Sequence, residues 1–151
     1  MISMGVIGIE HPGNAGAIAR AMKNFGVEDL YFFDPQCDPK SEEGRRRAKG
    51  GLDILESAKV LGMEELKRFD NIIGSSAKLG SDYNIKRNSI KPRELASRKK
   101  EFEDSDTIII LGRESIGLTN EEIALCDFLV YIPAGEYGTL NLSHAATILL
   151  Y

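Results

Sequence analysis

The stretch MGVIGIEHPGNAGAIARAMKNFG, residues 4–26, predicts a strand, a turn and a helix in succession. Met4–Ile9 is a short apolar run without charge, which is typical of a buried strand, and His11-Pro12-Gly13 favours a turn after it. From Asn14 onward the apolar residues recur at helical spacing, as Ile18, Met22 and Phe25. Gly26 then stands where a helix commonly ends in the left-handed conformation.

The same alternation continues along the chain. Further strands are predicted at Leu30–Phe33, Asn71–Ile73, Thr107–Leu111 and Phe128–Ile132, and helices at Glu42–Lys49, Arg93–Lys100, Thr119–Leu125 and Leu142–Tyr151. The clearest helix start is Thr119, because its hydroxyl and Glu122 can form a capping box. The polar stretch Ala77–Ser89 predicts a long mobile loop. This order indicates an α/β fold with a mostly parallel sheet flanked by helices, and we expect residues 1–151 to form a single domain.

Composition argues against several classes of protein. The 151 residues are 42% hydrophobic and 28% charged, which is ordinary for a globular domain. No apolar run approaches the roughly 20 residues that span a bilayer, and no basic leader precedes the first apolar segment. We therefore expect a soluble, cytoplasmic protein without membrane contact. Cys37 and Cys126 have no second cysteine or histidine at ligand spacing, so we expect free thiols and no metal.

The formal net charge of −4 argues against attraction of nucleic acid by the whole surface. The basic residues nevertheless gather in two clusters, one of Arg45, Arg46, Arg47 and Lys49 and one of Lys86, Arg87, Lys91, Arg93, Arg98, Lys99 and Lys100. Both clusters are candidate phosphate contacts. A solvated helix face is the simpler interpretation of either cluster taken alone.

Ligands of parallel α/β sheets collect beyond the carboxyl ends of the strands, so the segments after the strands are the candidate site. Four of them combine glycine with small or polar residues: 13–20 (GNAGAIAR), 74–77 (GSSA), 111–122 (LGRESIGLTNEE) and 132–143 (IPAGEYGTLNLS). Small residues there let backbone groups approach a ligand closely. An ordinary turn is the alternative for each glycine taken alone.

Taken in order, these segments closely resemble the three signature motifs of the SpoU branch of the SPOUT methyltransferases, over essentially the whole chain. The first motif matches Asn14, Gly16, Arg20, Phe25 and Gly26, the second Gly112, Glu114, Gly117 and Leu118, and the third Ile132, Leu140 and Asn141. Within that branch, residues 11–14 and 112–122 are most similar to the TrmJ-type enzymes. Those enzymes methylate the ribose of tRNA nucleotide 32, the first of the anticodon loop.

The resemblance implies an RNA 2′-O-ribose methyltransferase that uses S-adenosylmethionine and has RNA, in particular tRNA, as its partner. It implies a homodimer and a deep trefoil knot at the C-terminal end of the fold. It also implies that the cofactor is held by eight residues: Ser75, Ser76, Ala77, Gly112, Ile132, Gly138, Thr139 and Leu140. Thr139 stands where the family usually has serine, and it keeps the hydroxyl.

Arg20 occupies the position to which the resemblance assigns activation of the ribose hydroxyl. An arginine with a pKa above ~12 is a poor general base. We therefore expect Arg20 to align the hydroxyl and stabilise negative charge on the oxygen, while an RNA phosphate or water takes the proton. A surface ion pair is its alternative role. Asn14, Glu114 and Asn141 are the other catalytic candidates, because they can fix Arg20 or the ribose in one orientation; helix capping is the alternative for Asn14.

Other functions remain open at this point. A dinucleotide-binding domain would account for a glycine-bearing turn after the first strand and for Asp34 at the end of the second, but Gly13 and Gly16 do not give the G-x-G-x-x-G spacing. An RNA-binding protein that keeps the fold without turnover is a second alternative. Among methyltransferases, rRNA is the alternative substrate to tRNA.

Overall fold

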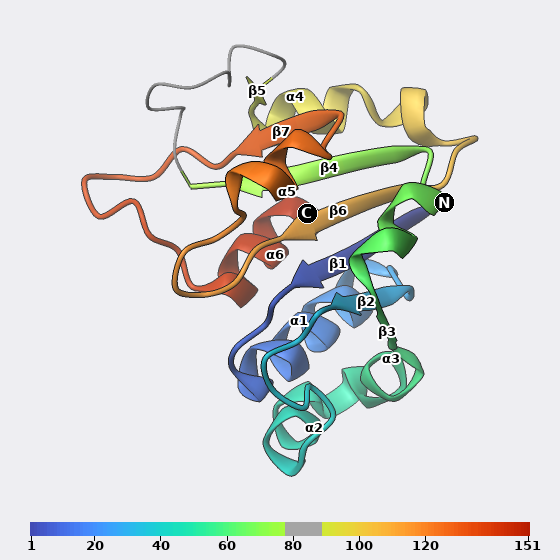
Figure 1. Cartoon of the computed structure of the whole chain (residues 1–151), viewed down its shortest axis with the longest axis vertical. Helices are drawn as coiled ribbons and strands as arrows, with labels where there is room; N and C mark the ends of the chain where they lie inside the picture. Colours follow the sequence, from blue (N-terminus) through green and yellow to red (C-terminus); the bar gives the residue numbers. More distant parts are fainter. Residues whose placement is uncertain (78–88) are drawn as a thin grey trace.

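The computed structural model describes residues 1–77 and 89–151, and their strands form one sheet in the order β3-β2-β1-β6-β4-β7-β5 (Figure 1). The strands are β1 (Ile2–Ile7), β2 (Leu30–Phe33), β3 (Lys59–Leu61), β4 (Asn71–Ser76), β5 (Ser89–Ile90), β6 (Thr107–Leu111) and β7 (Phe128–Tyr131). Every paired strand among them is parallel to its neighbour. The predicted α/β fold with a mostly parallel sheet is therefore confirmed.

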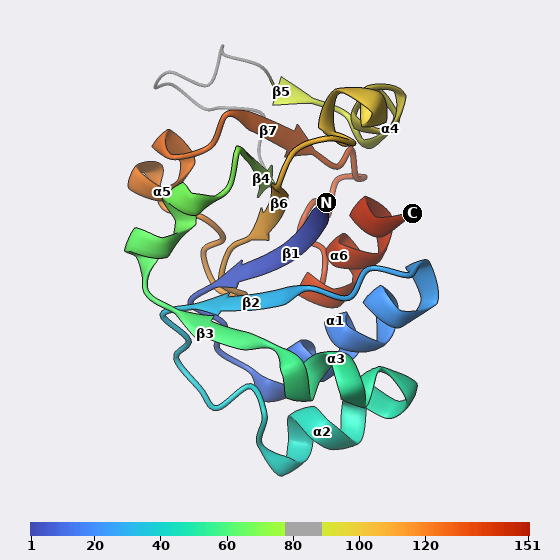
Figure 2. The same cartoon turned by 90° about the vertical axis from the view of Figure 1, so that its right-hand side faces the viewer.

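Helices cover both faces of the sheet (Figure 2). They are α1 (Pro12–Phe25), α2 (Glu42–Ala48), α3 (Leu52–Ser57), α4 (Pro92–Ser97), α5 (Asn120–Ala124) and α6 (Leu142–Leu150), with 3-10 turns η1 (Lys49–Gly51), η2 (Met63–Arg68) and η3 (Lys99–Phe102). Within the described ranges, no helix has the length and apolar character needed to cross a membrane.

Two hydrophobic layers hold these helices to the sheet, because alternate side chains of a strand point to opposite faces. In β6, Ile109 and Leu111 join the layer beneath α1 and α6, whereas Ile108 and Ile110 join the layer beneath η2. All five residues of β6 are buried. A strand that is apolar on both faces is expected in the interior of a parallel sheet.

The first strand and helix differ by two residues from their predicted positions. β1 covers Ile2–Ile7 instead of Met4–Ile9, because Gly8 adopts a left-handed φ of 65° and ends the strand. α1 begins at Pro12 instead of Asn14, because proline lacks an amide hydrogen and has a φ suited to the first helical position. Gly26 ends α1 with a φ of 70°, as predicted.

The largest differences between the predicted and the observed elements concern short segments. The sequence did not predict β3, β5, α3 or η2, all of which are short, and β4 continues through Ser75 and Ser76, which were expected to follow the strand. Ser89 belongs to β5 and not to the predicted loop. Residues 78–88 lie outside the described part of the chain, so the rest of that loop, with Lys86 and Arg87, stays a prediction.

Candidate active site

The carboxyl ends of three neighbouring strands bring most of the candidate cofactor residues to one edge of the sheet. β4 lies between β6 and β7, and all three run in the same direction (Figure 1). Ser75 and Ser76 end β4, while Gly112 directly follows β6 and Ile132 directly follows β7. From Ile132 the chain runs along this edge to α6 and carries Gly138, Thr139 and Leu140 in the connecting loop.

The segment after β6 is a closed hairpin. Arg113 and Gly117 exchange backbone hydrogen bonds of 3.3 and 2.9 Å. A Cβ at Gly112 would lie 2.1 Å from the carbonyl carbon of Gly117, so no other residue fits there without displacing the hairpin. The glycine of this motif is thus required by the closure of its own loop, in addition to any role beside a ligand.

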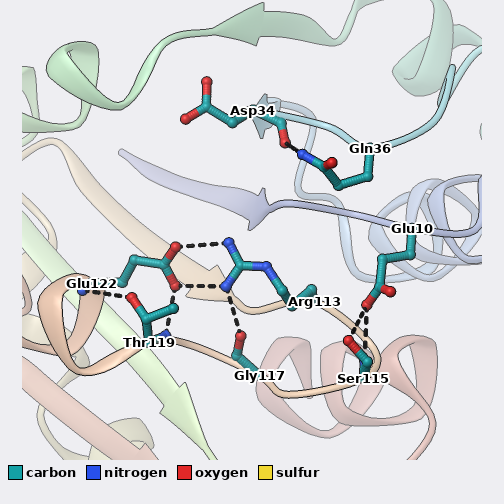
Figure 3. A network of polar contacts seen from close by, with 8 residues as sticks. All are labelled: Glu10, Asp34, Gln36, Arg113, Ser115, Gly117, Thr119 and Glu122. Carbon is teal, nitrogen blue, oxygen red and sulfur yellow. Dashed lines mark hydrogen bonds and ion pairs between the residues drawn. The ribbon is translucent and has the colours of Figure 1, made fainter.

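An ion pair anchors the hairpin to α5 (Figure 3). Arg113 donates from Nη2 to Glu122 Oε1 at 2.8 Å and from Nη1 to Glu122 Oε2 at 3.1 Å, and both side chains are largely buried. Thr119 and Glu122 form the predicted capping box. Burial favours a higher pKa for Glu122, but the hydrogen bonds from Arg113 and Thr119 outweigh it and hold this pKa below its usual value. The carboxylate therefore stays charged and holds the hairpin at neutral pH.

Glu114 connects the hairpin to the segment that precedes α1. Its Oε2 accepts from the amide of Glu10 at 2.8 Å, and its Oε1 accepts from the amide of His11 and from Asn14 Nδ2, both at 3.0 Å. The first and second motifs therefore meet directly. Asn14 is the third residue of α1 and does not cap it, because the N-cap position belongs to His11.

Glu10, in the segment before α1, in turn binds the hairpin through its side chain (Figure 3). Its Oε1 accepts from the amide of Ser115 at 2.9 Å and from the hydroxyl of Ser115 at 2.7 Å. These hydrogen bonds hold the pKa of Glu10 below its ordinary value. The sequence did not identify Glu10, because its partner Ser115 lies 105 residues away. It did not identify Arg113 and Ser115 either, because they lie between the motif positions. The only signal for these two was that they flank Glu114.

Arg20 lies apart from these contacts within one chain. It is exposed on α1, eight residues after Pro12, which places it about 12 Å along the helix from the carboxyl edge. Among the described residues, no hydrogen bond or ion pair joins it to Asn14, Glu114 or Asn141. Asn141 instead caps α6, where its Oδ1 accepts from the amide and hydroxyl of Ser143 at 2.9 and 2.7 Å.

Among the residues that the structure describes, the cysteines and acidic side chains form no second site. Cys37 and Cys126 are free thiols, as expected. Burial raises the pKa of the Cys126 thiol to about 12. In the described ranges no three histidine, cysteine, aspartate or glutamate side chains gather as metal ligands would. A cleft near Met1, Val27 and Phe102 lies at the amino ends of the strands, opposite the edge where parallel sheets bind ligands.

Part of the second basic cluster has a structural role. Arg98 pairs with Glu101 at 2.7 Å and lies over the ring of Phe128, 4.5 Å from its centroid. This guanidinium covers the edge of the core instead of standing free for a phosphate. In the first cluster, Arg45 is similarly engaged, with Glu56 at 2.7 Å.

Comparison with known proteins gives consistent matches along the whole chain. The model of the SpoU rRNA Methylase family matches residues 1–151. The tRNA (cytidine-2′-O-)-methyltransferase TrmJ of Methanocaldococcus jannaschii is 40% identical over 154 residues, which cover 100% of this chain and 66% of the relative. The tRNA (cytidine/uridine/adenosine-2′-O-)-methyltransferase TrmJ of Pseudomonas aeruginosa is 38% identical over 97% of this chain and 57% of the relative. The chain thus spans 57% to 66% of the length of these two relatives.

Solved structures share the fold. A probable methylase family protein from Haemophilus influenzae superposes with a TM-score of 0.90 at 32% identity, covering 99% of this chain and 63% of that one. A probable methyltransferase from Bordetella pertussis gives a TM-score of 0.81 at 31% identity, covering 99% and 94% of the two chains.

Proposed function

The chain belongs to the SpoU rRNA Methylase family, and from this premise we propose that it transfers a methyl group from S-adenosylmethionine to a ribose 2′-hydroxyl of RNA. The observation that carries the proposal is the meeting of the family's motif segments at one sheet edge, where Glu114 binds Asn14 beside the ends of β6, β4 and β7. This edge is where parallel α/β sheets bind their ligands.

The proposed substrate is tRNA, methylated at nucleotide 32. Support comes from the relatives in M. jannaschii and P. aeruginosa, which are named tRNA 2′-O-methyltransferases and are 40% and 38% identical to this chain. Ribosomal RNA is the alternative substrate. A cytoplasmic location follows from a tRNA substrate and is part of the same proposal.

The residues at the sheet edge fit S-adenosylmethionine by their chemistry. The eight candidate residues carry hydroxyl, aliphatic or no side chains and no formal charge. Ser75 and Ser76 are half-buried at the end of β4, and an added Cβ at Gly138 would meet no atom closer than 3.9 Å. Backbone groups and hydroxyls can therefore approach an adenine and an amino-acid tail. When bound, the cofactor supplies a methyl group on a positively charged sulfur.

Arg20 acts on the ribose in this proposal. The bound cofactor would supply the methyl group for the 2′-oxygen and keep the sulfur as a neutral thioether, and the hydroxyl proton would leave for an RNA phosphate or water. Arg20 donates hydrogen bonds to the oxygen, which orients it and stabilises its developing negative charge. A guanidinium is already protonated at neutral pH and has no acceptor site, so Arg20 takes no proton in this proposal.

A homodimer and a C-terminal trefoil knot complete the proposal. Arg20 lies about 12 Å along α1 from the carboxyl edge of its own sheet, so the arginine of a second copy is needed at the cofactor residues. Phe25 and Tyr151 are exposed at the ends of α1 and α6 and pack edge to face, with ring centroids 6.2 Å apart. Such exposed aromatic residues suit an interface between copies. The loop after β7, which returns along the sheet edge to α6, is the segment that would form the knot.

Methyl transfer to unmodified tRNA tests the proposal. The full chain is incubated with tritiated S-adenosylmethionine and either tRNA or rRNA transcripts, and the methylated ribose is mapped by mass spectrometry. We expect one 2′-O-methyl group at nucleotide 32, and near-complete loss of transfer in Arg20→Ala with the dimer intact. Normal turnover by Arg20→Ala would remove Arg20 from the mechanism. No transfer to tRNA or rRNA, with intact cofactor binding by calorimetry, would favour an RNA-binding protein; binding of NAD instead would favour the dinucleotide-binding alternative.

A further inference from the structure

The helix face that carries Arg20 also faces α2 and η1. Gly13, Gly16 and Arg20 lie on one stripe of α1, because they are spaced by three and four residues. A Cβ at Gly16 would lie 2.9 Å from Arg47 Cβ, and one at Gly51 would lie 2.7 Å from the backbone nitrogen of Arg20. The close packing of glycines therefore places α2 and η1 directly beside Arg20.

This packing gathers three basic residues that have no acidic partner in the described part of the chain. Arg20, Arg47 and Lys49 are exposed, and none of the ion pairs within residues 1–77 and 89–151 involves them. Two other basic residues nearby are paired, since Lys23 binds Asp53 and Arg45 binds Glu56, whereas the exposed Arg46 forms no ion pair with any described residue. Glu43 is an acidic neighbour of this surface, because its Oε1 would lie 3.0 Å and Arg47 Cγ 3.8 Å from a Cβ at Gly13.

Lys49 stands at a position where the backbone favours glycine. Its φ is 48° and its ψ is −122°, a conformation that costs energy for a residue with a side chain. The two residues that follow are both glycine. The backbone therefore gives no folding reason for a side chain at this position, and the exposed ammonium group of Lys49 is available for a ligand.

We infer that Arg47 and Lys49 form a phosphate-binding surface that holds the RNA strand beside Arg20. This inference rests on the proposed function, and it names where the RNA lies. Exposed, unpaired guanidinium and ammonium groups next to the residue that meets the ribose are what a polyanionic strand requires. The whole chain has a formal net charge of −4, so attraction of RNA depends on local groups of unpaired basic residues such as this one.

Salt dependence of RNA binding tests the surface. The variant Arg47→Ala/Lys49→Gly is compared with wild type and with Lys59→Ala/Lys67→Ala, which removes the same charge from exposed positions on β3 and η2. The Kd of an unmodified tRNA transcript is measured by fluorescence anisotropy at several salt concentrations. Two lost phosphate contacts should lower the slope of log Kd against log salt by about 1.4 to 1.8, with no change in the control.

Folding and the proposed function are monitored separately. Lys49→Gly alone relieves the backbone, so its thermal midpoint should not fall although RNA binding weakens. Arg47→Lys/Lys49→Arg keeps the charge and should keep the wild-type slope. Equal slopes for the test and control variants, or a wild type that does not bind the transcript, would overturn the inference. Calorimetry with S-adenosylmethionine should be unchanged in every variant; a wild type without cofactor binding or methyl transfer would instead overturn the proposed function.

Discussion

Replacement of Glu114 by glutamine tests whether its carboxylate positions the segment that carries Asn14. The carboxylate accepts three hydrogen bonds of 2.8 to 3.0 Å, one on Oε2 and two on Oε1. A glutamine keeps a single acceptor oxygen, and its NH₂ group would face the backbone N–H of either Glu10 or His11. At least one charge-assisted hydrogen bond is lost, and the others become bonds between neutral groups.

The expected loss of stability follows from these contacts. A hydrogen bond to a charged group contributes roughly 1.5–3 kcal/mol and one between neutral groups about 1 kcal/mol. Loss of one bond and weakening of two would cost at least about 2.5 kcal/mol in a fully buried site. Glu114 is only half-buried, and solvent screens part of this, so we expect a free energy of unfolding lower by roughly 1–2 kcal/mol.

The loss in kcat/KM should be larger than the loss in stability alone would cause. A displacement of Asn14 by about 1 Å can lower the rate up to 100-fold. Urea unfolding followed by circular dichroism gives the first quantity, and kcat/KM for tRNA methylation gives the second. The control is Glu121→Gln, the same chemical change at an exposed position in the first turn of α5. If Glu114→Gln and this control agreed within about 0.3 kcal/mol and showed equal kcat/KM, the positioning argument would be wrong.

Three further predictions concern the hairpin and the thiol beneath it. Because the pKa of Glu122 is lowered by folding, its contact with Arg113 stabilises the fold fully at a pH above 4.5, the ordinary pKa of a glutamate. This stabilisation is lost as the pH falls through the pKa of the folded state. Glu122→Gln should therefore cost about 2 kcal/mol at pH 7 by urea unfolding and clearly less in acid, and equal losses would contradict this. The pKa of Cys126 is raised to about 12, so only about 1 in 10⁴ molecules should carry the thiolate at pH 8. Its reaction with iodoacetamide should therefore be over 100-fold slower than that of a free peptide thiol at ~25 °C. Fast labelling would refute the burial of this thiol. Gly112→Ala should lose roughly 1–3 kcal/mol of stability by the same unfolding assay, whereas Gly50→Ala, with no atom within 4 Å of an added Cβ, should not, and similar losses would rule out the close contact in the hairpin.

Much of the fold could be predicted because its signals are local. The capping box of Thr119, the left-handed Gly26 and the apolar run of β6 each depend on residues a few positions apart. The two-residue shift of β1 follows from the left-handed φ of Gly8, a position whose surroundings also leave no room for a side chain. Gly8 ends that strand beside the guanidinium of Arg113, which would lie 2.6 Å from a Cβ there, and no local pattern reveals a neighbour so distant in sequence.

The candidate site was only partly predictable for the same reason. The motifs identified Asn14 and Glu114, but not that they bind each other across 100 residues. Nor did they identify Glu10, whose contact with Ser115 spans 105 residues. The motif identified Arg20 as a catalytic candidate. It did not predict that Arg20 lies far from its own sheet edge, because that distance depends on the direction in which α1 leaves the edge.

The amino-acid sequence determined the longer strands and helices and the short motifs that carry the chemistry, because periodicity, capping and glycine conformation act between near neighbours. The tertiary structure alone decided that β4 lies between β6 and β7, that Glu10 and Glu114 join two loops, and that α2 and η1 bring Arg47 and Lys49 beside Arg20. Those arrangements depend on packing between surfaces that are distant in sequence. The free energy of such packing arises only when the layers of the fold are in contact, so it cannot be assigned to any one segment.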